Sequence, residues 1–306
     1  MSSRKPPVTP AQRPRNPGPP GSVHDGAGAP SRPPVLRQPG RAADPDHRSA
    51  RHPAQRPAPA TRPAPRSPRM HPTLVAVAHG SRDPRALHTV LDLLERVREL
   101  RPALDVRLGH IELNRPLLAD TLRDTDGAAV LVPLLLGRGT HVKRDLPAAA
   151  ARAGHLRIRI ADPLGPHPLL VEALFERLLE AGWTPGTAVV LASAGSLDPD
   201  SAADTRRSAE LLSERLGGVP VVPAYASAAT PGVADAVRTL AARGHRRAAV
   251  ASYFTAPGRF ASASAAAASG PAAEPLGAHP ALARLVLRRY DEALARGARA
   301  PELATA

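Results

Sequence analysis

Residues 74–81 are Leu74-Val75-Ala76-Val77-Ala78-His79-Gly80-Ser81, a short apolar run that passes directly into a polar turn. Such a run is typical of a buried strand, and a turn followed by Asp83-Pro84 is typical of the start of a helix. Apolar residues at helical spacing then predict the helix itself: Leu87, Val90, Leu91, Leu94 and Val97. A strand that leads into a helix in this way is typical of α/β proteins.

Strands and helices continue to alternate as far as residue 181. Apolar runs predict three further strands, at residues 104–110, 128–136 and 156–161. Helical spacing of apolar residues predicts three further helices, at residues 116–123, 141–153 and 168–181. Parallel strands need helical crossovers on both faces of their sheet, so the predicted fold class is α/β with a parallel sheet.

The pattern occurs a second time further along the chain. The matched segments are 74–81 with 189–196, 116–120 with 231–235, and 164–168 with 276–280. The first two matches are offset by 115 residues and the third by 112. Matches in the same order at a nearly constant offset indicate a duplication. We therefore predict two tandem α/β domains, joined near Trp183-Thr184-Pro185-Gly186.

The differences between the two copies are informative. Where the first copy has His79, the second has Ala194, and Gly139-Thr140-His141 corresponds to Gly258-Arg259-Phe260. The second copy also lacks the β-branched residues of the fourth strand, which Gly270-Pro271-Ala272-Ala273-Glu274 replaces. The sequence thus predicts one active copy and one structural copy.

Residues 1–69 differ in composition from the rest of the chain. They hold 18 of the 37 prolines, 13 Lys or Arg, 3 Asp or Glu and no aromatic residue. Proline cannot donate a backbone hydrogen bond, and few apolar side chains are present to stabilise a fold, so we predict a disordered tail. It is either a basic arm for acidic partners or an upstream extension of a protein that starts at Met70. The predicted domains are a catalytic domain at 70–184 and a degenerate repeat at 185–306.

Composition excludes several classes of protein. The net charge of +14 comes mostly from the tail, and the remaining residues carry only +4, so no nucleic-acid partner is expected. The chain has no cysteine, which excludes disulfides and thiolate metal sites. No run of about 18 apolar residues and no secretory signal is present, so no membrane partner is expected and a cytoplasmic location is predicted.

His79 and His141 are the candidate catalytic residues. Each follows a predicted strand of the first copy, and ligands of parallel sheets bind beyond the carboxyl ends of the strands. A histidine pair there can hold Fe²⁺, Co²⁺ or Ni²⁺, and a neutral imidazole can also accept a proton. Glu112, which follows the second strand, is either a third ligand, a proton acceptor or a solvated carboxylate.

Four segments of the first copy resemble the CbiX/SirB-type sirohydrochlorin chelatases. They are Ala78-His79-Gly80-Ser81-Arg82, His110-Ile111-Glu112, Pro133-Leu134-Leu135-Leu136-Gly137-Arg138-Gly139-Thr140-His141-Val142-Lys143-Arg144-Asp145-Leu146-Pro147, and Leu164-Gly165-Pro166-His167-Pro168. The resemblance extends over residues 73–290 and implies two tandem flavodoxin-like domains of the class II chelatase fold. It also implies a lyase that holds metal and tetrapyrrole between its domains, with His79 and His141 as the metal-binding and proton-accepting pair.

The implied reaction inserts Fe²⁺, for siroheme synthesis, or Co²⁺, for cobalamin synthesis, into sirohydrochlorin. No organic cofactor is expected, and ATP is not needed because no phosphate-binding loop of the Gly-x-x-x-x-Gly-Lys type is present. The carboxylates of the macrocycle are expected to contact basic side chains and helix-start N–H groups near the histidines. These substrate-binding candidates are Gly80, Ser81, Arg82, Arg138, Lys143 and Arg144. The fused copies are expected to form a monomer with an internal pseudo-dimer.

Other functions fit the sequence less well. A histidine phosphatase needs Arg before its histidine, where this chain has Ala78, and no Gly-x-Ser-x-Gly elbow of a serine hydrolase surrounds Ser81. A non-catalytic carrier of tetrapyrrole or metal on the same fold stays as the alternative. His88, His110, His167 and His279 are predicted to be structural, the last two because they recur in both copies.

Overall fold

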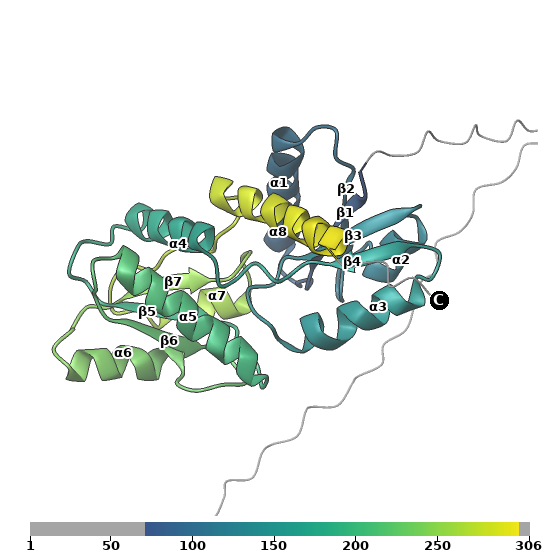
Figure 1. Cartoon of the computed structure of the whole chain (residues 1–306). Helices are drawn as coiled ribbons and strands as arrows, with labels where there is room; N and C mark the ends of the chain where they lie inside the picture. The colour runs from purple at the N-terminus through teal and green to yellow at the C-terminus, as the bar shows by residue number, and fades with distance from the viewer. Residues whose placement is uncertain (1–70, 300–306) are drawn as a thin grey trace, which may run out of the picture. The chain divides into compact units, whose positions relative to one another are not determined.

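The computed structural model describes residues 71–299, which lie within one compact unit, Ala64–Ala306. The tail predicted at residues 1–69 and the start proposed at Met70 lie outside the described residues. The described chain forms two parallel sheets with helices packed against them (Figure 1). No helix within residues 71–299 combines the length and apolar character that a membrane span requires.

The first sheet has four parallel strands in the order β2-β1-β3-β4. They are β1 (Thr73–Ala78), β2 (Val106–His110), β3 (Ala128–Pro133) and β4 (Arg157–Ile160). All four strands predicted in the first copy are therefore present. The third ends at Pro133 and not at residue 136, although the N–H of Leu134 still donates to the carbonyl of Val77 at 2.8 Å.

The connecting helices of the first copy are α1 (Pro84–Leu100), α2 (Leu118–Arg123), the π-helical turn η1 (His141–Asp145) and α3 (Leu146–Arg152). The single helix predicted at 141–153 therefore divides into η1 and α3. Helix α1 begins where Asp83 accepts a hydrogen bond from the N–H of Arg85, with Pro84 in the first turn. A π-helical turn is rare and is often found at functional sites.

The second sheet repeats this arrangement with three parallel strands in the order β6-β5-β7. Its strands are β5 (Val189–Ser193), β6 (Val221–Tyr225) and β7 (Ala249–Tyr253), and its helices are α5 (Pro199–Arg215), α6 (Val233–Ala242) and α7 (Arg259–Ala266). Among the described residues only a single bridge, between Val250 and Ala272, takes the place of a fourth strand. The predicted loss of that strand is confirmed.

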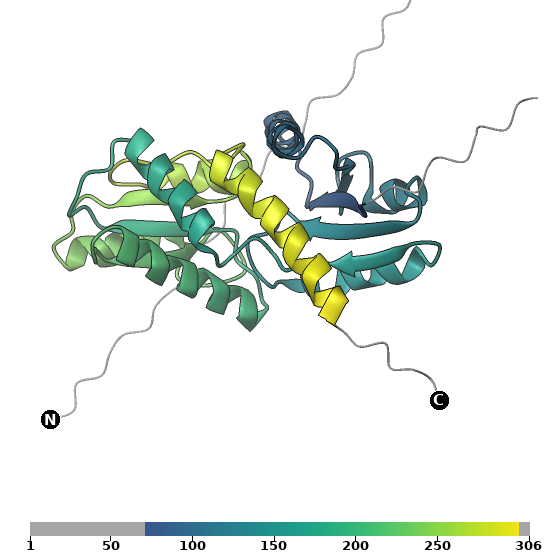
Figure 2. The same cartoon turned by 45° about the horizontal axis from the view of Figure 1, so that its top comes forward.

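The last helix of each repeat packs on the other repeat. Helix α4 (Pro168–Glu180) ends the first repeat but packs on α5 and β7, whereas α8 (Pro280–Arg299) ends the second and packs on α1, β3 and β4. Figures 1 and 2 show this exchange, with α8 lying across the first sheet. The hydroxyl of Tyr290 on α8 also donates to the carbonyl of Pro72 at 2.7 Å.

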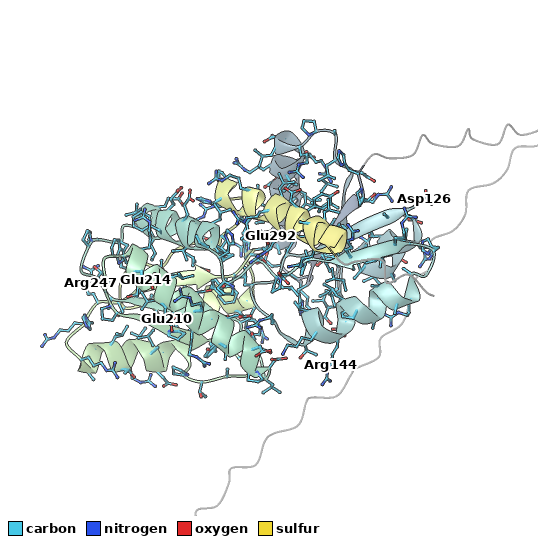
Figure 3. The ribbon with its side chains drawn as sticks, in the orientation of Figure 1. Asp126, Arg144, Glu210, Glu214, Arg247 and Glu292 are labelled. Atoms are coloured by element: carbon cyan, nitrogen blue, oxygen red, sulfur yellow. The ribbon has the colours of Figure 1, made fainter. Side chains whose placement is uncertain are left out.

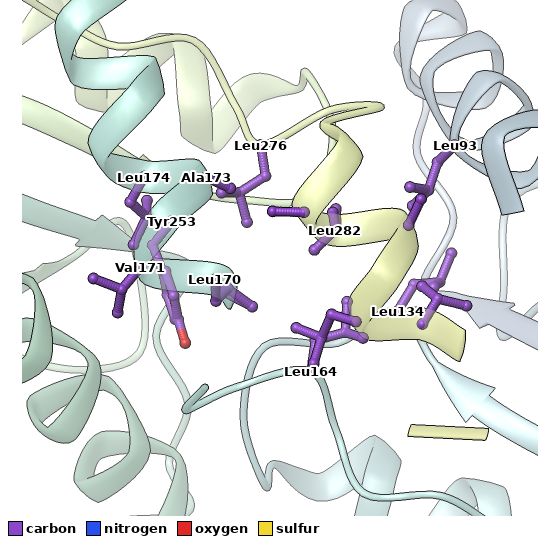
Figure 4. Close-up of a cluster of buried hydrophobic side chains, with 14 of the residues drawn as sticks. Leu93, Leu134, Leu164, Leu170, Val171, Ala173, Leu174, Tyr253, Leu276 and Leu282 are labelled. Atoms are coloured by element: carbon purple, nitrogen blue, oxygen red, sulfur yellow. The ribbon is translucent and has the colours of Figure 1, made fainter. Parts of the chain in front are cut away.

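The exchanged helices join the two halves into one hydrophobic core. Figure 4 shows Leu170, Val171 and Leu174 of α4 beside Tyr253 of β7, and Leu282 of α8 between these and the first sheet. All of these side chains are buried. The core therefore continues from one repeat into the other.

Two histidines begin the exchanged helices. The Nδ1 of His167 accepts from the N–H of Leu169, and the Nδ1 of His279 accepts from the N–H of Ala281. His279 also lies 3.0 Å from the carboxylate of Glu176. Both histidines thus cap a helix, as the sequence predicts.

Candidate active site

The loop after β1 carries His79, and a glycine allows it to approach the loop after β2. Gly80 has φ +104°, and a Cβ atom there would lie 1.9 Å from the carbonyl oxygen of Glu112. Only glycine fits such a position. The N–H of Glu112 donates to the carbonyl of His79 at 3.0 Å, and the two side chains face each other with His79 Nδ1 3.6 Å from Glu112 Oε1.

His141 is the first residue of η1 and reaches the same place from the end of β3. The ring centroids of His79 and His141 are 4.7 Å apart, and the ring planes lie at 84° to each other. The structure thus brings together the three residues that the sequence proposes as catalytic. They come from three loops, each at the carboxyl end of a different strand of the first sheet.

Asp145 is a site residue that the sequence analysis did not select. Its Oδ2 lies 2.6 Å from His141 Nδ1, four residues earlier in the chain. The i to i+4 spacing of a histidine and a carboxylate within the motif is a signal by which it can be found. A carboxylate at this place holds the imidazole in the tautomer with the proton on Nδ1, which leaves Nε2 free to bind a metal or a proton.

The four side chains are accessible to a ligand. Their exposed fractions are 43% for His79, 53% for Glu112, 37% for His141 and 49% for Asp145. Within residues 71–299 no group of three or more His, Cys, Asp or Glu is arranged so that it could hold a metal ion.

The second repeat keeps the backbone contacts between the loops that correspond to His79 and Glu112, and its side chains at these positions differ. The N–H of Ser227 donates to the carbonyl of Ala194 at 3.0 Å, as Glu112 does to His79, and a Cβ on Gly195 would lie 1.9 Å from the carbonyl of Ser227. Ser227 therefore stands where the first repeat has Glu112. Together with Ala194 and Phe260, all three reactive groups are replaced.

Two of the predicted substrate-binding residues form ion pairs with the second repeat. Arg138 donates from its backbone N–H and its guanidinium to the carboxylate of Asp204, and Lys143 lies 2.7 Å from both Asp198 and Asp200. These hydrogen bonds raise the pKa of both side chains, and the one from Lys143 lowers the pKa of Asp198. Arg138 and Lys143 thus pair with carboxylates of the second repeat, and their side chains stay 51% and 38% exposed.

The N–H of Ser81, one of the expected anion donors, has a partner within the protein. The N–H of Ser81 donates to the side chain of Asn114 at 2.6 Å. At the start of α1 the carboxylate of Asp83 accepts a hydrogen bond from the N–H of Arg85. Arg82 and Arg144 are exposed and form no ion pair with any residue of the described chain. Figure 3 shows Arg144 extending away from the ribbon.

Proteins of known sequence resemble both repeats. The CbiX family model matches residues 73–181 and again residues 188–293. A sirohydrochlorin cobaltochelatase from Methanococcoides burtonii is 27% identical over 123 residues, covering 35% of this chain and 94% of that protein. A sirohydrochlorin ferrochelatase from Bacillus subtilis is 30% identical over 171 residues, covering 53% of this chain and 66% of that protein.

A solved structure shows the same fold. SirB from Bacillus subtilis with Fe³⁺ superposes with a TM-score of 0.62 at 24% identity, covering 75% of this chain and 98% of that chain. This likeness confirms two tandem flavodoxin-like domains with parallel sheets. Because the family model matches both repeats, and with them more than half of the residues, the chain belongs to the CbiX family.

Proposed function

We propose that this chain inserts a divalent metal ion, Fe²⁺ or Co²⁺, into sirohydrochlorin. One observation carries the proposal: His79, His141 and Glu112 meet at one edge of the first sheet, and the second repeat replaces all three although it keeps the backbone contacts at the His79 and Glu112 positions. If these residues served the fold, the second repeat would need them too. The names of the matched relatives support sirohydrochlorin as the substrate. We assign catalysis to residues 70–184 and a degenerate repeat to residues 185–306.

The proposed reaction exchanges two protons for one metal ion. The macrocycle loses its two pyrrole N–H protons as M²⁺ enters, so the site needs both a weak metal ligand and a proton acceptor. The Nε2 lone pairs of His79 and His141 can serve as either, because Gly80 and Asp145 face their Nδ1 atoms at 3.2 and 2.6 Å. When His79 accepts a pyrrole proton on Nε2, Glu112 can take the proton from its Nδ1, which lies 3.6 Å from Glu112 Oε1. Neither ATP nor an organic cofactor enters this scheme.

Exposed residues around the pair suit a macrocycle with an apolar face and a carboxylate rim. Leu113 follows Glu112 and is 54% exposed, and Leu197 of the second repeat is 88% exposed. Leu197 follows Ser196, whose Oγ lies 3.5 Å from where a Cβ of Gly139 would be. We assign the macrocycle face to these leucines and its carboxylates to Arg82 and Arg144, two of the four predicted basic residues, which form no ion pair within residues 71–299.

The experiment is anaerobic absorbance spectroscopy of the purified full chain with sirohydrochlorin and Fe²⁺, Co²⁺ or Ni²⁺. We expect conversion to the metallated product faster than in a control without protein, in the absence of ATP. The order of the rates identifies the physiological metal and so the pathway. Binding of macrocycle or metal without faster insertion would instead indicate a carrier.

A further inference from the structure

The second repeat holds the loop that carries His141. The loop runs from Leu136, beyond the end of β3, to Lys143 in η1. Leu136, Arg138 and Lys143 each form a hydrogen bond with a side chain of the second repeat. The hydroxyl of Tyr253 donates to the carbonyl of Leu136 at 3.1 Å and pairs with Ser208 at 2.8 Å. The buried side chain of Tyr253 on β7 therefore fixes the first residue of the loop through a hydrogen bond.

Asp204 of α5 holds the middle of the loop. Its side chain is only 4% exposed, and it accepts hydrogen bonds from the backbone N–H of Arg138 at 2.8 Å and from the guanidinium at 2.7 Å. A buried carboxylate is stable only when it is paired in this way, so the pairing fixes the loop backbone as well as the arginine. Lys143 extends the contact to Asp198 and Asp200 at the start of the same helix.

Gly139 lies between these contacts and also touches the second repeat. A Cβ built on it would lie 3.5 Å from the Oγ of Ser196 and 4.0 Å from its Cβ. His141 itself follows two residues later. The ring of His141 lies beside that of His79, with the centroids 4.7 Å apart. This position thus depends on a loop whose contacts are distant in sequence; Tyr253 is 117 residues from Leu136.

We infer that the second repeat is the positioning element of the metal-inserting site, with Asp204 as its principal positioning residue. Asp204 touches neither metal nor macrocycle; it acts through Arg138 on the place of His141. The inference rests on the proposed function and gives the degenerate repeat a part in it. It also gives Arg138 and Lys143 a part as anchors of the loop that carries His141.

The test starts from Asp204→Asn in the full chain, which keeps an acceptor for the Arg138 N–H and removes the charge. A misplaced catalytic group costs about 10- to 100-fold in rate, so we expect kcat for Co²⁺ insertion to fall within that range while KM for sirohydrochlorin stays near wild type. Tyr253→Phe removes the other support and is the second variant, should Asp204→Asn fail to fold. Hydrogen exchange of the peptide spanning residues 136–146 should rise in both.

A disulfide supplies the rescue. The distance of 4.0 Å between the Cβ positions of residues 139 and 196 suits a disulfide, and the chain has no other cysteine. In Gly139→Cys/Ser196→Cys/Asp204→Asn, oxidation with diamide before metal is added should restore most of the lost kcat, and the reduced protein should stay slow. Because a disulfide also stabilises the fold, circular dichroism at the assay temperature should show the same folded fraction before and after oxidation; a rescue that only follows a rise in folded fraction would indicate a merely destabilising role of Asp204.

Glu172→Gln is the matched control, because Glu172 pairs with Arg284 between α4 and α8, far along the chain from the His141 loop. It should leave kcat unchanged. Wild-type turnover in both folded loop variants, or no recovery on oxidation, would overturn the positioning role. A wild-type chain that inserts no metal would overturn the proposed function instead, and loop exchange would then still report whether the anchoring exists.

Discussion

At the level of single residues, His79, His141 and Glu112 each stand on a different loop, and backbone contacts bring them together. Gly80 is essential to this, because any side chain there would collide with the carbonyl of Glu112. The sequence places both histidines correctly because a strand end is visible as a change from apolar to polar residues. Asp145 was not selected because its i to i+4 spacing from His141 is common on helix surfaces, and only the structure shows that the two side chains meet.

Replacing the reactive side chains should abolish turnover and leave the fold intact. For His79→Ala and His141→Ala we expect the rate of metal insertion to fall at least about 100-fold, the usual size of a lost acid–base group. Glu112→Gln should fall less, because the imidazoles remain. His88→Ala, on the exposed face of α1, is the control and should keep full activity. Near-wild-type turnover in both histidine variants would exclude the site, provided that circular dichroism shows folded protein.

Asp145 should matter through the imidazole it holds. Loss of a carboxylate behind a metal-binding histidine lowers affinity or activity about 10- to 100-fold, so Asp145→Ala should lose activity in that range. The tautomer of His141, measured by ¹⁵N chemical shifts, should become mixed. Asp126→Ala is the matched control, because this exposed carboxylate precedes β3, whereas the site residues follow the carboxyl ends of the strands. An unchanged Nδ1–H tautomer in Asp145→Ala would contradict the assignment.

At the level of elements, the periodicity of the sequence predicts the strands of the first sheet and the missing fourth strand of the second. It does not predict where α4 and α8 pack, because an amphipathic helix shows which of its faces is buried but not against what. The partners of Arg138 and Lys143 were missed for a similar reason. Those aspartates lie 55 to 66 residues away, and no local pattern links them to the loop.

The cap of α4 should make stability depend on pH. Burial, and then nearby arginines, lower the pKa of His167, whose neutral Nδ1 accepts the N–H of Leu169. Because the unfolded chain binds the proton more tightly, the free energy of unfolding should be greatest above about pH 6.5 and fall as the pH drops below it. Urea unfolding at pH 8 and pH 5.5 measures this difference.

His167→Asn supplies the comparison for that measurement, since asparagine caps helices and does not titrate. It should match wild type closely at pH 8 and lose less stability at pH 5.5. Part of the pH dependence should persist, because burial also lowers the pKa of His110. An equal loss of stability in wild type and variant would show that the cap does not titrate.

At the level of the whole described chain, the exchange of α4 and α8 binds the repeats together more than the linker does. Leu282, Leu285, Val286 and Tyr290 of α8 are almost fully buried, mostly in the shared core. Each such side chain contributes about 1.5–3 kcal/mol when it leaves water. Residues 184–186 of the linker are exposed and can be cut without touching this core.

A chain cut at the linker should therefore stay assembled. With a protease site inserted after Pro185, we expect the two cleaved pieces to elute together on size exclusion and to keep most of the metal-insertion rate. They should separate only when urea unfolds them. If the pieces part in native buffer, the exchanged helices do not hold the repeats together.

The exchange also bears on how the two copies have diverged since their duplication. A mutation in the second copy can change the packing of the first copy, because α8 packs on the first sheet and Asp204 bonds to the His141 loop. At the reactive positions the second copy has Ala194, Ser227 and Phe260, whose side chains form no hydrogen bond or ion pair with the first copy within residues 71–299, so changes there leave the anchoring of the His141 loop in place. Natural selection on the second copy therefore acts on the residues that pack against the first copy. Its reactive residues can change, whereas its fold must be kept.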